Sequence, residues 1–205
     1  MENIKNIVNF FFELMHLKRI KRSGWLLLGI EKVDSVAEHC FIAAQIAYLL
    51  AKMENADAEH AAIMTLFHDN AEARIADLNL IQSYYLKSKR RAERKAFFDQ
   101  VKNLPSEEEL RQLFEEFEES ITPEAVIARD ADRLELAIQA KCYIDIGNSK
   151  SLQNWLDRTR TLLKTNSASR LINVIEKGDM NEWWRAIRGI KKERKRVERE
   201  LGKSI

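Results

Sequence analysis

Glycine and proline, the residues that most often form tight turns, are scarce in this sequence. Its 205 residues include six glycines and two prolines. All-β sandwiches and loop-rich α/β enzymes need many such turns, so both classes are disfavoured. Hydrophobic residues make up 45% of the chain and charged residues 32%, which fits a folded domain and argues against disorder. The composition predicts an all-α protein, and the length suits one sizeable core, so we expect a single-domain helical bundle over residues 1–205.

Cysteine and long apolar runs are also lacking. The two cysteines, Cys40 and Cys142, are too few for a disulfide framework and favour a reducing compartment, so we expect a cytoplasmic protein. No uninterrupted apolar run approaches the ~20 residues that cross a membrane. The apolar stretch from Ile7 to Leu14 is interrupted by Asn9 and Glu13 and predicts a helix, not a signal peptide. A membrane is therefore not an expected partner.

Neither sign of charge dominates the sequence. Lysine and arginine number 34 and aspartate and glutamate 32, which gives a formal net charge of +2. Proteins that bind nucleic acid non-specifically are usually more basic, so no nucleic-acid polymer is expected as a partner. Residues 107–119 are acidic and residues 185–203 mix basic residues with glutamate, and we interpret both as solvated helix faces. The basic run 87–95 is a candidate for steering anionic substrates.

Apolar residues recur every three to four positions along most of the chain, which is the spacing of a helix face. Two segments, Ser35–Glu38 and Ser106–Glu109, have the pattern of a capping box, which starts a helix. Thr122 followed by Pro123 marks a further helix start. One helix follows the basic run and ends before Pro105, and the other predicted helices cover about residues 2–19, 34–53, 58–73, 106–120, 122–144, 152–163, 168–175 and 180–201.

No internal repeat or flexible linker divides the chain. We expect the domain core to cover about residues 5–180 and a charged helix to follow at about residues 180–202. Residues 74–80 are expected to form a turn, and residues 25–30, which are short and apolar, are the one weak strand candidate.

Three predicted helices carry ionisable residues where a core is expected. His68 and Asp69 are adjacent in the apolar helix 58–73. His39 lies in the apolar stripe of its helix, and Asp132 lies among apolar residues of another. Burying such groups is costly unless a partner satisfies them. A lone buried histidine is usually hydrogen-bonded core, but two imidazoles and two carboxylates together can coordinate a divalent cation. We therefore predict one divalent metal ion, without choosing among Mn, Co, Mg, Ni, Fe and Zn.

The order of these residues resembles a known family pattern. His39, then His68–Asp69, then Asp132 matches the H…HD…D order of the HD-domain superfamily of metal-dependent phosphohydrolases, over about residues 5–180. The segment His68–Leu78, HDNAEARIADL, is similar to the HD-x-x-E-x-x-x-x-D-[LI] element of the 5′-deoxynucleotidase branch. The resemblance implies an HD-domain fold.

Three further segments resemble the same branch. Ser35–His39 is similar to its S-V-A-E-H element, and Arg22–Trp25 to its arginine-to-tryptophan connector. Asp130–Glu135 resembles its D-x-D-[KR]-x-E element, and Glu135 could hydrogen-bond a metal ligand or bind Arg19 or Arg22. Asn79 departs from the pattern, because many members have proline shortly after the second acid. The turn geometry at this point is therefore expected to differ.

The resemblance implies that His39, His68, Asp69 and Asp132 hold the metal ion. Asp130 competes with Asp132 for this role. The two residues lie two positions apart and cannot share one helix face. We prefer Asp132, because it aligns with the final aspartate of the family pattern. The resemblance also implies a homodimer.

Four more residues are candidates for the chemistry. Glu72 lies one helical turn after His68, where it can orient the attacking water; the alternative is a surface glutamate paired with a basic residue. The resemblance implies an acid/base role for Asp77, and the alternative is a helix-terminal or turn aspartate. Arg22 can present a bidentate fork to a phosphate, and Trp25 can pack against a sugar or base. The resemblance implies nucleotide contacts for both, whereas the alternative is core packing for Trp25 and a solvated charge for Arg22.

These features predict a metal-dependent phosphomonoesterase that hydrolyses (deoxy)nucleoside 5′-monophosphates through a metal-activated water. A phosphodiesterase or nucleotide pyrophosphohydrolase of the same superfamily is the first alternative, since its metal ligands would be the same. A non-catalytic regulator that binds a nucleotide or a protein partner is the second. We favour the phosphomonoesterase because the Arg22–Trp25 connector and the Glu72 and Asp77 pair resemble that branch.

Overall fold

The computed structural model describes residues 2–147 and 150–201, which form α-helices, one short 3-10 helix and no strand. An isolated bridge between Lys21 and Ser35 is the one β-type pairing in these ranges. The predicted all-α class is confirmed. The elements in chain order are α1 (Glu2–Leu17), α2 (Ser23–Leu27), α3 (Val36–Glu54), α4 (Ala58–Phe67), α5 (Glu72–Ile75), α6 (Leu80–Tyr85), α7 (Lys89–Val101), α8 (Glu107–Glu119), α9 (Pro123–Asp145), η1 (Lys150–Leu152), α10 (Gln153–Leu162), α11 (Asn166–Lys177), α12 (Glu182–Arg185) and α13 (Arg188–Leu201).

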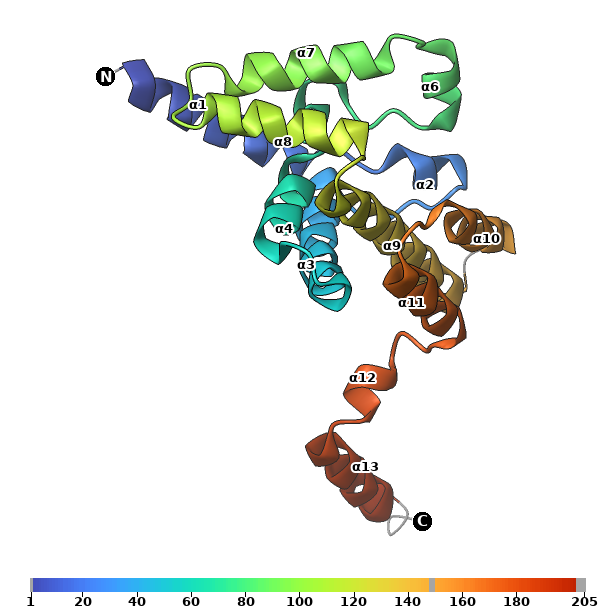
Figure 1. Cartoon of the computed structure of the whole chain (residues 1–205). Coiled ribbons are helices and arrows are strands. Elements are labelled where there is room, and N and C mark those ends of the chain that lie inside the picture. The colour runs from blue at the N-terminus through green and yellow to red at the C-terminus, as the bar shows by residue number, and fades with distance from the viewer. Residues whose placement is uncertain (1, 148–149, 202–205) are drawn as a thin grey trace.

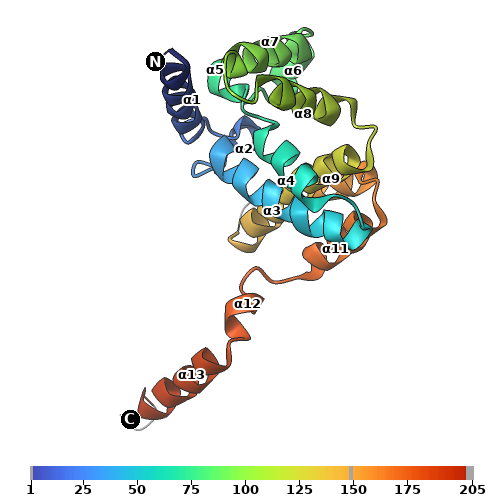
Figure 2. The same cartoon turned by 60° about the vertical axis from the view of Figure 1, so that its left-hand side comes forward.

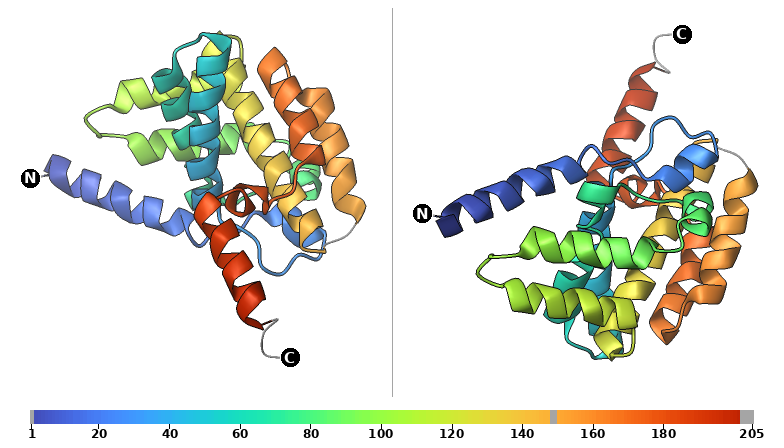
Figure 3. Two further views of the ribbon diagram at one scale, coloured as in Figure 1. Left: turned by 90° about the horizontal axis from the view of Figure 1, so that it is seen from below. Right: turned by 90° about the horizontal axis from the view of Figure 1, so that it is seen from above.

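Helix α9 is the centre of the bundle. It packs against α3 and α4 on one side and against α10 and α11 on the other (Figure 1; Figure 3). Its start is fixed as the sequence predicts, because Thr122 Oγ1 accepts the N–H of Ala125 and Pro123 occupies the first turn. Apolar side chains such as Leu134, Leu156 and Ile172 fill the space between these helices. This core holds α3, α4 and α9 in fixed relative positions.

Helix α3 is long and apolar enough to cross a membrane by length and composition, and it is the one such helix in the described part of the chain. In the structure it is a bundle helix that packs on α4 and α9. Its start is the predicted capping box: Ser35 accepts the N–H of Glu38, and Glu38 accepts the N–H of Ser35. The cap fixes the first turn of α3, which carries His39.

Helices α7 and α8 form an antiparallel hairpin at one end of the bundle (Figure 1). Phe97 and Phe114 stack between them, with ring centroids 4.7 Å apart. Helix α8 also packs on α4 and α9. The capping box predicted at Ser106 is wrong, because this side chain makes no cap hydrogen bond. Glu107 instead accepts the N–H of Asn103 at 2.7 Å, so the acidic side chain closes the preceding turn.

The weak strand candidate at residues 25–30 is wrong, since residues 23–27 form the short helix α2. Trp25 is 1% exposed, and its ring packs on Tyr143 and Trp155 with centroids 5.4 Å and 4.8 Å away. A Cβ on Gly24 would lie 3.0 Å from the ring of Trp155. The connector therefore approaches α10 as closely as glycine permits.

The predicted helix 58–73 is wrong at its end, because α4 stops at Phe67. The ring Nδ1 of His68 hydrogen-bonds the carbonyl of Thr65 at 2.6 Å, and this carbonyl is the acceptor that a continuing helix would need. The backbone then forms hydrogen bonds between residues three apart, such as the one from the N–H of Glu72 to the carbonyl of Asp69. His68 and Asp69 thus lie in a turn, not in the middle of a helix.

Two other predictions differ in detail. The expected turn 74–80 ends in a helix start, because Asn79 forms a capping box with Gln82 and begins α6. The expected helix 180–201 is two helices, α12 and α13. Gly189 lies close to the break and lowers the helix propensity there. Helix α13 projects away from the bundle (Figure 2).

Candidate metal centre

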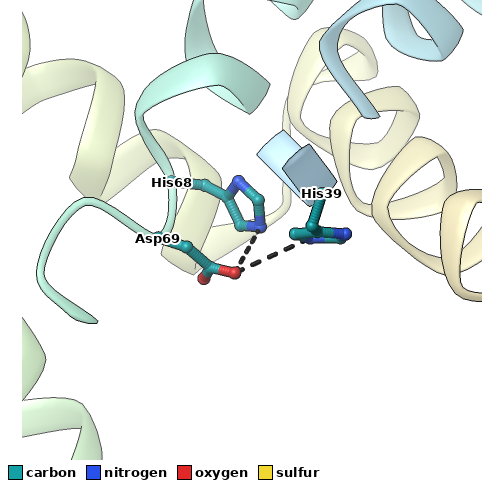
Figure 4. A group of neighbouring side chains, drawn as sticks. All are labelled: His39, His68 and Asp69. Carbon is teal, nitrogen blue, oxygen red and sulfur yellow. Dashed lines mark ion pairs between the residues drawn. The ribbon is translucent and has the colours of Figure 1, made fainter. Parts of the chain in front are cut away.

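His39, His68 and Asp69 converge at one point of the bundle (Figure 4). One ligand atom from each lies within 4.8 Å of the other two. Asp69 Oδ2 is 3.1 Å from Nε2 of His68 and 3.7 Å from Nε2 of His39. His39 comes from the capped first turn of α3, and the other two residues come from the turn that ends α4.

Asp132 of α9 completes the group. Its Oδ1 lies 3.3 Å from Nε2 of His39 and 3.9 Å from Nε2 of His68. Burial alone raises the pKa of Asp69 and of Asp132, but the neighbouring imidazoles outweigh burial, so both pKa values are lowered, that of Asp132 to about 2. Both carboxylates are therefore ionised at neutral pH, which suits a cation.

Both imidazoles are fixed by hydrogen bonds on their far side. Nδ1 of His39 lies 2.5 Å from a carboxylate oxygen of Glu135, and Nδ1 of His68 lies 2.6 Å from the carbonyl of Thr65. Since both partners are acceptors, each Nδ1 keeps its proton, and Nε2 is the ring atom that can give its lone pair to a metal ion once its own proton has left. Nε2 of His39 is buried and has no hydrogen-bond partner among the described residues. These residues fit a divalent metal ion with nitrogen and oxygen ligands.

Asp130 does not face the His/Asp group but the loop between α10 and α11. It is fully buried, and its carboxylate accepts the backbone N–H groups of Lys164 and Thr165 at 2.7–3.1 Å. It therefore ties α9 to the loop between α10 and α11. The geometry favours Asp132 over Asp130 as the ligand.

Glu72 lies at the start of α5 and is only 3% exposed. The surface-pair alternative fails, because Arg74 pairs with Glu13 instead. Oε2 of Glu72 is buried without a hydrogen-bond partner among the described residues. Burial, and next the negative charges of Asp69 and Asp77, raise the pKa of Glu72 well above its usual range. A carboxyl group of this kind can hold a proton near neutral pH.

Asp77 and Arg22 are held together. Asp77 Oδ2 accepts the N–H of Ser23 at 2.8 Å and lies 4.0 Å from Nε of Arg22. Nη1 of Arg22 lies 3.3 Å from Asp69. Burial alone would lower the pKa of Arg22, but the charges of Asp69 and Asp77 hold it above its usual value. The residue before Asp77, Ala76, has φ of 64° and ψ of 166°, a strained backbone of the kind found at functional sites.

A cleft of about 250 Å³ runs beside these residues. The predicted site residues that line it are His68, Asp69, Asp132, Arg22, Glu72 and Asp77. His39 and Trp25 are buried and do not line it. The Trp25 ring lies in the core, so the structure favours packing over contact with a sugar or base. The sequence did not assign roles to the remaining lining residues. Two of them, Lys89 and Glu93, lie in the basic run 87–95, which the sequence indicated as a candidate for steering anionic substrates. The unassigned residues are Ala71, Lys89, Glu93, Phe114, Phe117, Glu118 and Arg129.

The family model of the HD domain matches residues 14–171, and the chain belongs to this family. It is similar to the 5′-deoxynucleotidase HDDC2 of Bos taurus, with 29% identity over 175 residues that cover 84% of this chain and 85% of the relative. It is also similar to the 5′-deoxynucleotidase hdd1 of Schizosaccharomyces pombe, with 31% identity over 65% of this chain and 70% of the relative.

Solved structures have the same fold. A conserved hypothetical protein from Pyrococcus furiosus superposes with a TM-score of 0.71 and 33% identity, over 83% of this chain and 99% of that chain. The HD phosphohydrolase DatZ of cyanophage S-2L, solved with dA and one catalytic Zn²⁺ ion, superposes with a TM-score of 0.52 and 15% identity, over 82% of this chain and 96% of that chain. The second likeness is one of fold.

Proposed function

We propose that this protein is a metal-dependent 5′-deoxynucleotidase, which releases phosphate from deoxynucleoside 5′-monophosphates. One observation carries the proposal: Arg22, Glu72 and Asp77 line the same cleft as the His/Asp group. A site that only stores a metal ion needs neither a buried cation nor an unpaired carboxyl beside it. The names of the curated relatives support the same reaction.

We propose one ion, held by His39, His68, Asp69 and Asp132. When bound, a divalent ion lowers the pKa of water to near neutral and polarises a phosphoryl oxygen. Mn, Co, Mg, Ni, Fe and Zn all remain to be tested, because nitrogen and oxygen ligands accept several of them.

The surrounding side chains supply binding and proton transfer. Arg22 has a planar fork of donors for the phosphate, and its charge is permanent. Hydrolysis joins a water oxygen to phosphorus and breaks the bond to the 5′ oxygen, so the water loses a proton and the leaving oxygen gains one. Glu72, with its raised pKa, can orient the water and exchange a proton with it. Asp77, fixed by Ser23, is the second acid/base group.

Phosphate release from a nucleotide panel tests the proposal. The protein is loaded with each metal in turn and given deoxynucleoside 5′-monophosphates, their ribose counterparts and 3′-monophosphates. Release from the 5′-deoxy compounds is the expected result. Cyclic nucleotides and guanosine polyphosphates are included, because cleavage of these alone would favour the phosphodiesterase or pyrophosphohydrolase alternative.

A variant separates an enzyme from a regulator. Asp69→Ala should abolish turnover, whereas Asp99→Ala, an exposed site on α7, should leave it intact. If no metal gives phosphate release from any nucleotide in the wild type, the enzyme assignment is wrong. A regulator would instead retain nucleotide binding without turnover.

We also propose a homodimer in the cytoplasm. Helix α1 exposes one apolar stripe, in which Phe11 is 56% and Phe12 70% exposed, and α3 exposes Phe41 and Leu49 at 61% and 63%. Exposed apolar residues in such rows commonly mark an interface. Mass measurement by light scattering tests the dimer, and Phe12→Glu should shift the protein toward monomer if α1 forms the contact.

A further inference from the structure

Lys89 is a cation in the cleft to which the proposed mechanism gives no task. It is the first residue of α7 and lines the cleft together with Asp69 and Glu72. Its Nζ lies 3.2 Å from Oε1 of Glu93, one helical turn further on, and 3.5 Å from the carbonyl of Leu78. The side chain therefore bridges the start of α7 and the loop that follows Asp77.

The position of Lys89 conflicts with a local rule of helix stability. The N-terminus of a helix is the positive end of its dipole, where acidic residues stabilise and basic residues do not. The first turn of α7 carries Lys89, Arg90 and Arg91 and no acidic residue. An unfavourable local choice such as this one is expected where a residue serves function and not stability.

The other two cations of the cleft have stronger attachments to the protein. Arg129 donates to Glu118 at 2.8 Å and to the carbonyl of Phe117 at 3.2 Å, and it lies 4.1 Å from the centroid of the Phe117 ring. Arg22 pairs with Asp69 and Asp77. Lys89 has one ion pair, within its own helix, and a long contact with the carbonyl of Leu78, and ion pairs of this kind are weak. Its ammonium group can therefore change partner at small cost.

The cleft is lined by acidic side chains, among them Asp69, Asp77 and Asp132. A nucleotide phosphate brings about two further negative charges near neutral pH, so a cation beside the metal site would favour its binding. Burial lowers the pKa of Lys89, but the charges of Glu93, Glu72 and Asp69 outweigh burial and raise it. Lys89 is therefore charged and already interacts with the carboxylates of the site.

We propose that Lys89 is a second phosphate-binding residue of this site, paired with Glu93 until the nucleotide binds, and that it joins Arg22 in holding the phosphate of the nucleotide. The inference rests on the proposed function for its substrate. It explains why α7 begins with a basic residue over the cleft. Lys89 exchanges its contact with Glu93 for one with the phosphate when the nucleotide binds.

Lys89→Met tests this role, and Lys95→Met is the matched control. Lys95 is on the same helix, is 76% exposed and forms an equivalent pair with Asp99. Two constants are measured on the metal-loaded proteins: inhibition by inorganic phosphate and inhibition by a deoxynucleoside. Lys89→Met should weaken phosphate inhibition and raise KM by about tenfold or more, the usual effect of losing a hydrogen bond to a charged group. Deoxynucleoside inhibition should stay within about twofold of wild type.

Other outcomes overturn the inference. An unchanged constant for phosphate in Lys89→Met contradicts it, and so does a loss confined to deoxynucleoside inhibition, which would place Lys89 at the nucleoside. Lys89→Arg should restore most of the phosphate affinity. If Lys89→Met does not fold, Glu93→Gln decides, because freeing Lys89 should tighten phosphate inhibition and a weakened constant would contradict the role. Calorimetric binding of inorganic phosphate reports on Lys89 even if no nucleotide is hydrolysed, so failure of the proposed function is recognised separately.

Discussion

The carboxylate of Glu135 accepts a hydrogen bond from Nδ1 of His39 at 2.5 Å, across the contact between α3 and α9. This contact fixes the orientation of an imidazole that we propose as a metal ligand. Glu135→Ala should therefore reduce metal affinity by about 10–100-fold, the usual cost of losing such a partner. Metal titration by calorimetry measures the effect. Glu119→Ala on the exposed face of α8 is the control, and equal affinity in the two variants would contradict the positioning role.

Asp130 and Asp132 make a matched pair for a second prediction. Asp132→Asn should lose bound metal and activity, because its oxygen faces both imidazoles. Asp130→Asn should keep the metal but lower the free energy of unfolding by about 1–3 kcal/mol, since it weakens buried charge-assisted bonds to Lys164 and Thr165. Metal content and urea unfolding of both proteins give the answer. The reverse pattern would make Asp130 the ligand.

Glu72 should make the stability of the metal-free protein depend on pH. Its pKa is higher in the folded than in the unfolded state, so its proton favours folding at low pH, and this contribution is lost as the pH rises through the folded-state pKa. In Glu72→Gln the side chain at this position is uncharged at every pH. Metal-free Glu72→Gln should therefore be more stable than metal-free wild type at about pH 8, by roughly 1 kcal/mol or more, and nearly equal at about pH 4. Urea unfolding at the two pH values checks this, and a difference independent of pH would contradict it.

Trp25 should act on stability and not on substrate binding. Trp25→Ala removes a ring buried against Tyr143 and Trp155, so the free energy of unfolding should fall by about 3–5 kcal/mol. Chemical unfolding measures it, with Trp183→Ala, a 73% exposed position on α12, as the control. A variant of normal stability with a raised KM would instead indicate nucleotide contact.

Sequence reasoning found those parts of the fold that depend on local signals. The capping pattern at Ser35 and the Thr122–Pro123 start place α3 and α9 within two residues. The same pattern at Ser106 failed, because whether a serine caps depends on a backbone geometry that the following residues also determine. Helix ends were harder still, as the break after Phe67 is made by the side chain of His68.

The candidate site was predictable to a similar degree. Its ionisable residues stood out because they interrupt apolar helix faces. The H…HD…D order of the family then indicated that they act together. Lys89 was indicated only as a member of the basic run 87–95, and Glu118 was not found, because the surfaces of α7 and α8 are charged throughout and only packing reveals which side chains face the cleft. The burial of Trp25 was undecidable for the same reason: its neighbour Trp155 is distant in sequence.

The proposed metal ligands come from three helices that are far apart along the chain: α3, the end of α4 and α9. Whatever binds between them binds only the folded form, so its affinity adds to the stability of the whole domain by mass action. Chelation should thus lower the melting temperature as well as stop turnover. In a cell depleted of that ion, the protein would lose its activity, and its abundance would also fall because the unfolded form is degraded by proteases.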